Sequence, residues 1–222
     1  MTINTLPGLD ISWSAVSPDF DETFIQYNIY RRETGTTPWT LLVVITDIET
    51  TSYTDYLTAN GVSYDYYMTW NATIGQTTLE SSPSSTVTDS VTFSGIGAFL
   101  HLYTDPTNYT QFGDVRVSNT TEQNLTPINI WGNQKPTYHV GPMFQTKTTL
   151  SSVLKWGQDN DRLAALSTLQ QAQSSHGSVV VFRSSIGEIR YVNITNRQEQ
   201  MRAGQIVQVS LTMGEADFTV GS

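Results

Sequence analysis

The stretch GVSYDYYMTWNA, residues 61–72, decides the fold of the first half of the chain, because it places four large aromatic side chains in one short segment. Successive side chains of a β-strand point to opposite faces, so the stretch divides into two sets. One face carries Tyr64, Tyr66, Met68 and Trp70, and the other carries Asp65, Tyr67 and Thr69. Burial of each large side chain stabilises a fold by about 1.5–3 kcal/mol. The stretch therefore predicts an inward-facing strand of a β-sandwich rather than a ligand-binding platform.

The same alternation continues through the surrounding sequence, in segments of strand length separated by turn residues. These segments are LDISWS, IQYNIYRR, WTLLVVI and TSYTDY. In the second segment the expected inward side chains are Ile25, Tyr27 and Ile29, and the expected outward ones are Gln26, Asn28 and Tyr30. Residues 9–92 show no segment of helical period. The first half is therefore predicted to be all-β.

Several features make residues 5–93 similar to a fibronectin type III domain: Trp13, the segments YNIYRR and TSYTDYLTANGVSYDYYMT, and the closing ESSPSSTVT. The resemblance implies a β-sandwich. It also implies a tyrosine corner, in which the Tyr64 hydroxyl caps nearby backbone close to the corner residue Leu57. Such domains serve as spacers, adhesive modules and ligand binders, so the resemblance implies a fold and leaves the function open.

Charge separates the chain into two parts. Residues 1–96 hold two basic residues against eleven acidic ones, a net charge of −9, whereas residues 97–222 hold nine of each and are neutral. We therefore expect two domains, at residues 1–96 and 97–222. The acidic domain would repel a phosphate backbone and the neutral one shows no basic stripe, so nucleic acid is not an expected partner.

Cysteine is absent, so the fold is expected to rest on packing without disulfides. The first residues, MTINTLPGLD, show no signal-peptide pattern. The longest aliphatic run, residues 41–45, is far too short to cross a bilayer. We therefore expect a protein without a membrane span.

The second half reads as a mainly β domain with one helix. Residues 105–114, 118–124 and 131–143 are rich in turn residues, and we expect loops there, with short strands between them. A helix is predicted at about residues 160–176 from its N-cap candidates, its apolar face and its final glycine, which are Asp159 or Asp161, then Leu163, Leu166 and Leu169, then Gly177. A hairpin at residues 178–194 with Gly187 at its turn and a terminal alternating strand follow. The expected architecture is a split β-barrel-like domain with one packed α-helix.

The order of PTYHVG, LSSVLKW, the helix, VVVFRSSIGEIRYVNI and GQIVQVSLTMGEAD makes residues 130–217 similar to domains of tail and baseplate proteins of long-tailed bacteriophages. Distal tail proteins and minor tail proteins belong to this group. The resemblance implies a virion structural protein of the tail tip that forms a ring around the tail tube with copies of itself and with other tail proteins. The first domain would then project outward.

Edge strands are natural assembly surfaces, because they carry unpaired backbone donors and acceptors. We therefore expect the hairpin at residues 178–194 to contact neighbouring subunits. The candidate assembly residues are Phe182, Arg183, Gly187, Arg190 and Tyr191.

Catalytic patterns are missing from the sequence. His101, His139 and His176 fall in different predicted elements, and no HExxH, GxSxG, P-loop or Rossmann pattern occurs. The acidic run at residues 19–22 lacks the ligand alternation of a calcium loop, so a solvated acidic loop is the simpler interpretation. We expect no enzymatic activity, no cofactor and no metal site.

A carbohydrate-binding or adhesive module of a cell-surface or tail-fibre protein is the alternative. Exposed aromatic rings beside acidic residues suit sugar rings, and repetition of a weak site in a ring would add avidity towards host surface glycans. The candidate sugar-contact residues are Trp39 and Tyr67.

Overall fold

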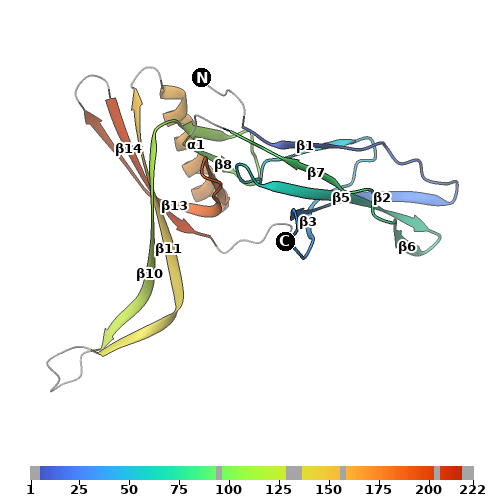
Figure 1. Ribbon diagram of the computed structural model, residues 1–222, viewed down its shortest axis with the longest axis horizontal. Helices are drawn as coiled ribbons and strands as arrows, with labels where there is room; N and C mark the ends of the chain where they lie inside the picture. Colours follow the sequence, from blue (N-terminus) through green and yellow to red (C-terminus); the bar gives the residue numbers. More distant parts are fainter. Residues whose placement is uncertain (1–5, 94–96, 129–136, 156–158, 203–205, 217–222) are drawn as a thin grey trace. The chain divides into compact units, whose positions relative to one another are not determined.

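Strands account for nearly every regular element of the chain, so the predicted mainly β class is confirmed (Figure 1). The computed structural model describes residues 6–93, 97–128, 137–155, 159–202 and 206–216. These residues form two compact units. Unit 1 holds residues 6–93 and 184–189, and unit 2 holds residues 97–183 and 190–216. Across the described ranges, no helix is long and apolar enough to cross a membrane.

Unit 1 contains two antiparallel sheets of unequal size. The smaller sheet pairs β1 (Leu9–Ser12) with β4 (Ser52–Asp55). The larger sheet has the order β3–β2–β5–β6, and β7 also pairs with β5. Its strands are β2 (Glu22–Glu33), β3 (Thr40–Ile45), β5 (Ser63–Ile74), β6 (Thr77–Glu80) and β7 (Val87–Ser90).

The core of unit 1 follows the predicted alternation only in part. Tyr27 is fully buried, and Tyr64 and Tyr66 are nearly so, as predicted. Met68 and Trp70 were expected in the same core but are only half-buried. Met68 lines a surface groove beside β1, which leaves part of its side chain accessible to solvent.

The outward face of β2 and β5 departs further from the prediction. Asn28, Asp65 and Thr69 were expected to face solvent, yet each is only 4% exposed. Neighbouring side chains cover them and supply hydrogen bonds; for example, the Asn28 amide donates to the Thr69 hydroxyl at 3.3 Å. Buried polar groups are tolerated when they are paired in this way. Alternation therefore identified the two faces correctly but not the burial of the polar one.

A buried ion pair joins the two sheets of unit 1. Asp55, on β4, is fully buried and lies 2.7 Å from Nη1 of Arg31, on β2. The Tyr66 hydroxyl, on β5, donates to the same Asp55 oxygen at 2.9 Å, and the Leu57 amide donates to the other oxygen at 2.8 Å. Burial, together with the adjacent Asp55 carboxylate, raises the pKa of the Tyr66 phenol. The Asp55 carboxylate thus links β4 to both β2 and β5.

The tyrosine corner that the sequence resemblance implies is present. The Tyr64 hydroxyl accepts a hydrogen bond from the Ala59 amide at 3.1 Å, and Leu57 is buried beside it. The corner fastens the loop between β4 and β5 to the start of β5.

The free edge of β5 is closed by two serines. Ser81 donates its amide to the Trp70 carbonyl at 2.9 Å, while its hydroxyl accepts the Trp70 amide at 3.0 Å. Ser84 makes the same pair of bonds with Met68, at 2.9 and 3.0 Å. Pro83, which has no N–H to donate, lies between the two serines. The segment between β6 and β7 thereby completes the ladder without offering a regular strand edge to another chain.

Unit 2 is built on one seven-stranded sheet with the order β10–β11–β14–β13–β12–β8–β9. Its strands are β8 (Ala98–Leu102), β9 (Tyr109–Phe112), β10 (Val115–Ile128), β11 (Thr137–Lys155), β12 (Val180–Ser184), β13 (Ile189–Arg202) and β14 (Ile206–Glu215). Among the described strands the sheet ends at β10 and β9, so the predicted split barrel is an open sheet with no closure.

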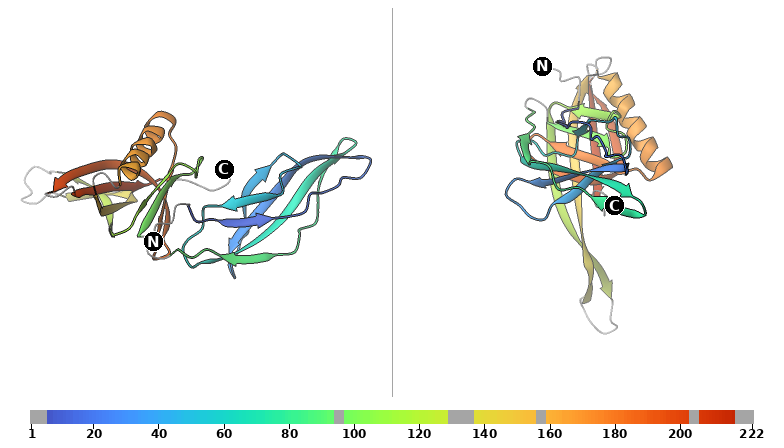
Figure 2. Two further views of the ribbon diagram at one scale, coloured as in Figure 1. Left: turned by 90° about the horizontal axis from the view of Figure 1, so that it is seen from above. Right: turned by 90° about the vertical axis from the view of Figure 1, so that its right-hand side faces the viewer.

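Strands β10 and β11 form a long ribbon where loops were predicted. The two strands pair from Val115↔Ser152 to Ile128↔Thr137, although β11 pairs with β14 only over Lys147–Lys155. The ribbon therefore runs past the rest of the sheet (Figures 1 and 2). The loop prediction failed because turn residues are tolerated where the ladder is irregular. Pro142 lies where the register breaks, between the pairs Gln123↔Phe144 and Leu125↔Val140, as expected of a proline inside a sheet. The predicted INIWG strand lies partly outside the described residues.

Helix α1 (Asn160–His176) lies against one face of this sheet, over the range predicted from the sequence (Figure 2). Leu166 and Leu169 are fully buried in the core of unit 2, and Leu163 packs at its margin. Gly177 ends the helix in the left-handed conformation with φ of 63°. Asp159 occupies the N-cap position, but its carboxylate binds the Lys155 amide at 2.8 Å instead of a first-turn amide.

The ion pair at Asp55 gives a direct test of unit 1. Removal of one partner leaves the other charge buried without compensation, which typically costs about 3–5 kcal/mol. We expect Asp55→Ala to lower the free energy of unfolding of unit 1 by this amount in urea titrations. The exposed Asp21→Ala is the control, with an expected change below about 0.5 kcal/mol. A loss at Asp55 as small as that of the control would contradict the role assigned to the pair.

Candidate functional site

The hairpin predicted to mediate assembly is formed by β12 and β13, but both strands lie inside the sheet. Phe182 and Arg183 are fully buried within the chain, so they are not available to a neighbouring subunit in this conformation. Gly187 forms the turn with φ of 89°. Arg190 donates to the Thr148 hydroxyl at 3.3 Å, and the ring of Tyr191 is half-buried. Of these five residues, Phe182 belongs to the core of unit 2, and the turn residue Gly187 belongs to unit 1.

The accessible backbone lies elsewhere, on the β10–β11 ribbon. Beyond Lys147, β11 has no neighbour on its β14 side among the described strands, and β10 is the outermost strand of the sheet. Both long edges of the ribbon at residues 121–128 and 137–146 therefore lack a strand partner in the described part of the chain. These edges were not predicted from the sequence, because prolines and a glycine in this region are typical of loops.

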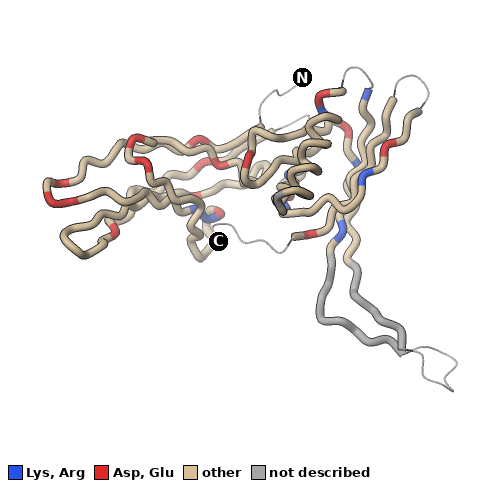
Figure 3. Tube along the Cα trace, turned by 180° about the vertical axis from the view of Figure 1, so that it is seen from behind, with Lys and Arg blue, Asp and Glu red and all other residues tan. Residues whose placement is uncertain are grey.

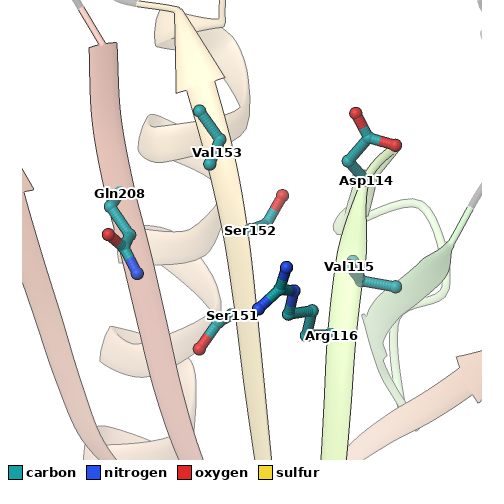
Figure 4. A pocket seen from close by; sticks show the side chains of 7 residues that line it. All are labelled: Asp114, Val115, Arg116, Ser151, Ser152, Val153 and Gln208. Atoms are coloured by element: carbon teal, nitrogen blue, oxygen red, sulfur yellow. The ribbon is translucent and has the colours of Figure 1, made fainter.

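The sheet next to the ribbon carries a polar surface hollow. Strand pairing aligns Arg116, Ser151 and Ser210 across β10, β11 and β14. A surface hollow of about 560 Å³ lies here, and Arg116 extends from β10 toward β11 (Figure 4). The other side chains that line it are Asp114, Val115, Ser152, Val153 and Gln208. The hollow offers hydroxyl and amide groups together with one carboxylate, Asp114, and one guanidinium, Arg116.

The two candidate sugar-contact residues meet on the outer face of unit 1. Trp39 and Tyr67 lie with ring centroids 4.6 Å apart and ring planes at 74°. Tyr30, directly opposite Tyr67 in the β2–β5 register, stacks on it at 4.7 Å with the planes at 19°. The Arg32 guanidinium covers Trp39 at 4.2 Å. The sequence thus identified two members of a four-residue cluster.

The geometry of this cluster is that of packing. Side chains stand roughly perpendicular to a sheet, so a stacked cross-strand pair such as Tyr30 and Tyr67 presents ring edges to solvent. Arg32 occupies one face of Trp39, a cation–π contact. A sugar ring stacks on an open aromatic face. Here Tyr30 already covers one face of Tyr67, and Arg32 covers one face of Trp39.

Carboxylates extend the cluster at both ends. Glu80 accepts hydrogen bonds from the Tyr30 and Thr69 hydroxyls and from the Asn28 amide. Desolvation, together with the Glu80 charge, raises the pKa of Tyr30 and of Tyr67. At the other end, Asp65 binds Arg32 at 3.0 Å. The result is a continuous chain of aromatic and charged contacts across the face.

Asp65 is held in its charged form by several donors. The hydroxyls of Thr88 and Thr34 donate to one oxygen at 2.8 and 2.9 Å, and Arg32 binds the other. The hydrogen bond from Thr88 lowers the pKa of Asp65 most. The hydrogen bond from Thr34 and the contact with Arg32 lower it further.

The described ranges include two of the candidate groups considered from the sequence, His101 and the acidic run at residues 19–22. These ranges contain no group of three or more His, Asp or Glu placed to hold a metal ion. His101 is fully buried, with Nδ1 3.0 Å from the Leu102 carbonyl, and is a core residue. The acidic run forms a turn, in which the Asp19 amide donates to the Glu22 carboxylate at 3.1 Å.

Comparisons with known proteins give weak likenesses only. No protein family model and no curated protein matches the chain. A chain from the tail of an empty gene transfer agent (GTA) particle of C6 symmetry is 12% identical, with 60% of this chain and 100% of that chain covered and a TM-score of 0.34. A chain from the virion of a native GTA particle is 10% identical, with 58% and 96% covered and a TM-score of 0.33. Values this low do not establish a relationship.

The state of Asp65 predicts an acid-dependent loss of stability. Because the folded pKa is lowered, its contribution is complete above the unfolded value of about 3.9 and disappears as the pH falls through the folded pKa. We expect unit 1 to lose stability below about pH 4, and Asp65→Asn to show a flatter dependence there. Thermal unfolding of both proteins across this range measures the difference. Parallel pH curves would show that Asp65 has no such role.

The packing geometry also predicts the outcome of a glycan array. We expect that neither Trp39→Ala nor Tyr67→Ala abolishes the binding of any glycan to the chain. We expect both variants to lower the melting temperature. Leu79→Ala, an exposed apolar residue on β6, is the matched control. A glycan whose binding is lost in both aromatic variants but kept in the control would show that the cluster is a sugar site.

Proposed function

We propose that the protein is a structural subunit of the virion tail of a long-tailed bacteriophage, located at the tail tip and assembled as a ring around the tail tube. The observation that carries the proposal is the β10–β11 ribbon with its two unpaired edges. The resemblance of residues 130–217 to distal and minor tail proteins supports the same assignment.

A ribbon with exposed edges is unfavourable in a monomer. A two-stranded ribbon is marginally stable in water, and its exposed edges carry rows of unpaired N–H and C=O groups. Pairing with a neighbouring subunit satisfies these groups, and repetition of a head-to-tail contact closes a ring when the rotation fits. The proposed contact is therefore between the ribbon of one subunit and a sheet edge of the next.

The hairpin at residues 178–194 has a different place in this proposal from the one expected from sequence. With Phe182 and Arg183 in the core, only the remaining three candidates, Gly187, Arg190 and Tyr191, reach the boundary of the fold. They belong to the margin of a subunit contact, and the ribbon forms its centre.

Unit 1 serves as the outward decoration in this proposal. Acidic residues are spread over the strands and loops of unit 1, and residues 1–96 contain only two basic residues, Arg31 and Arg32. Unit 2 carries both acidic and basic residues (Figure 3). Like-charged domains on the outside of a particle repel one another and keep particles dispersed. We also propose that the fibronectin type III-like character of unit 1 suits a spacer in the host-attachment region.

A variant with a shortened ribbon tests the proposal. Replacement of residues 122–145 by Asn-Gly keeps the segment of β11 that pairs with β14 and removes the extension. We expect the wild-type chain to form closed oligomers in native mass spectrometry and electron microscopy, and the shortened variant to remain a folded monomer.

The control for this experiment is Phe20→Ser, a change of a fully exposed side chain in unit 1 that should leave assembly intact. Oligomers of unchanged size from the shortened variant would overturn the role of the ribbon. A strictly monomeric wild-type chain that also fails to bind tail components would overturn the proposed function.

A further inference from the structure

The smaller sheet of unit 1 ends at a strand whose outer edge is unpaired among the described residues. Strand β1 pairs only with β4. The Trp13 amide donates to the Thr51 carbonyl at 3.0 Å, which continues this ladder. Because antiparallel pairing alternates along a strand, Leu9 and Ile11 bond toward β4 in the same way. Asp10 and Ser12 therefore direct their backbone N–H and C=O groups away from β4.

An apolar groove lies beside this edge. It has a volume of about 190 Å³ and lies between β1 and the segment that closes β5. Ile11 and Trp13 form one wall, and Met68 and Val87 form the other. Val87 is 59% exposed, a large fraction for an apolar side chain at the mouth of a groove. The two sheets are thus open to solvent on this side.

Trp13, which lines the groove, also carries an unsatisfied donor. The indole Nε1 of Trp13 is buried and has no hydrogen-bond partner in the described part of the chain. A buried donor without an acceptor costs about 1–3 kcal/mol, so an incoming carbonyl would be favoured at this point. Backbone groups at the edge, apolar walls and a buried indole N–H together match the features of an extended peptide.

We propose that β1 binds an extended segment of another polypeptide, which adds a third strand to the β1–β4 sheet and places apolar side chains in the groove. Strand addition of this kind gains affinity from main-chain hydrogen bonds and specificity from pockets for alternate side chains. The surroundings select the charge of the segment. Asp10 lies on β1, and the net charge of residues 1–96 is −9, so the segment is neutral or basic.

The inference is independent of the ring proposal. It concerns unit 1 alone and requires neither the ribbon nor an oligomer. Ser81 and Ser84 close the edge of β5 next to the groove, so the outer edge of β1 is the one that stays open there in the described residues.

A synthetic peptide of alternating Thr and Val with a Lys at each end is the probe. We expect addition of the peptide to the full chain to protect the Asp10 and Ser12 amides from hydrogen exchange. We also expect it to shift the Trp13 indole N–H resonance downfield. The same peptide with Pro in place of the central residues should do neither, because Pro has no N–H and does not fit a paired strand.

Two matched variants locate the binding. Val87→Lys places a charge at the mouth of the groove and should weaken peptide binding about tenfold or more, the loss expected for one buried valine. Val44→Lys, an exposed valine on β3 away from the groove, should leave binding unchanged. The inference is overturned by an unshifted indole resonance at millimolar peptide, or by equal losses in the two variants. A shift of the indole without protection of the β1 amides would show a pocket for small apolar groups and would also overturn it.

Discussion

Satisfaction of backbone hydrogen bonds at strand edges is the constraint on which this structure depends. The described part of the chain is mainly β, with a single helix, and it contains strand edges that no other described strand pairs. Unit 1 closes the edge of β5 with Ser81 and Ser84, whose hydroxyls replace the missing carbonyls of a regular strand. Unit 2 instead extends β10 and β11 as a ribbon beyond its sheet. The closed edge favours a separate domain, and the open ribbon favours assembly.

Unit 1 has no cysteine, and polar contacts link its two sheets where many small β-domains have a disulfide. The fully buried Asp55 connects β4 to β2 through Arg31 and to β5 through Tyr66, so it joins the two sheets. Ion pairs of this kind stabilise little compared with apolar packing, but they are costly to break. On the outer face, Asp65 extends the same principle to the Arg32 contact. The sandwich is therefore specified by paired charges in addition to its apolar core.

The sequence predicted those features that depend on local alternation. The buried face formed by Tyr64 and Tyr66 could be derived from periodicity, and helix α1 from periodicity together with its cap residues. The ribbon could not, because Pro142 and its neighbours resemble loop residues until the opposing strand is known. Sequence reasoning also selected Trp39 and Tyr67, but it could not show that their rings are engaged with Tyr30 and Arg32. Such contacts link residues that are distant in the chain, which no local pattern records.

Hydrogen exchange at the ribbon, compared between the isolated chain and the assembled particle, tests the central claim most directly. The amides at residues 121–128 and 137–146 on the outer edges should exchange rapidly in the isolated chain, because none of the described strands pairs with them. The same amides should become protected on assembly, while those of Lys147–Lys155 stay protected in both states. Equal protection of the ribbon in the two states, or continued rapid exchange in the particle, would contradict the account.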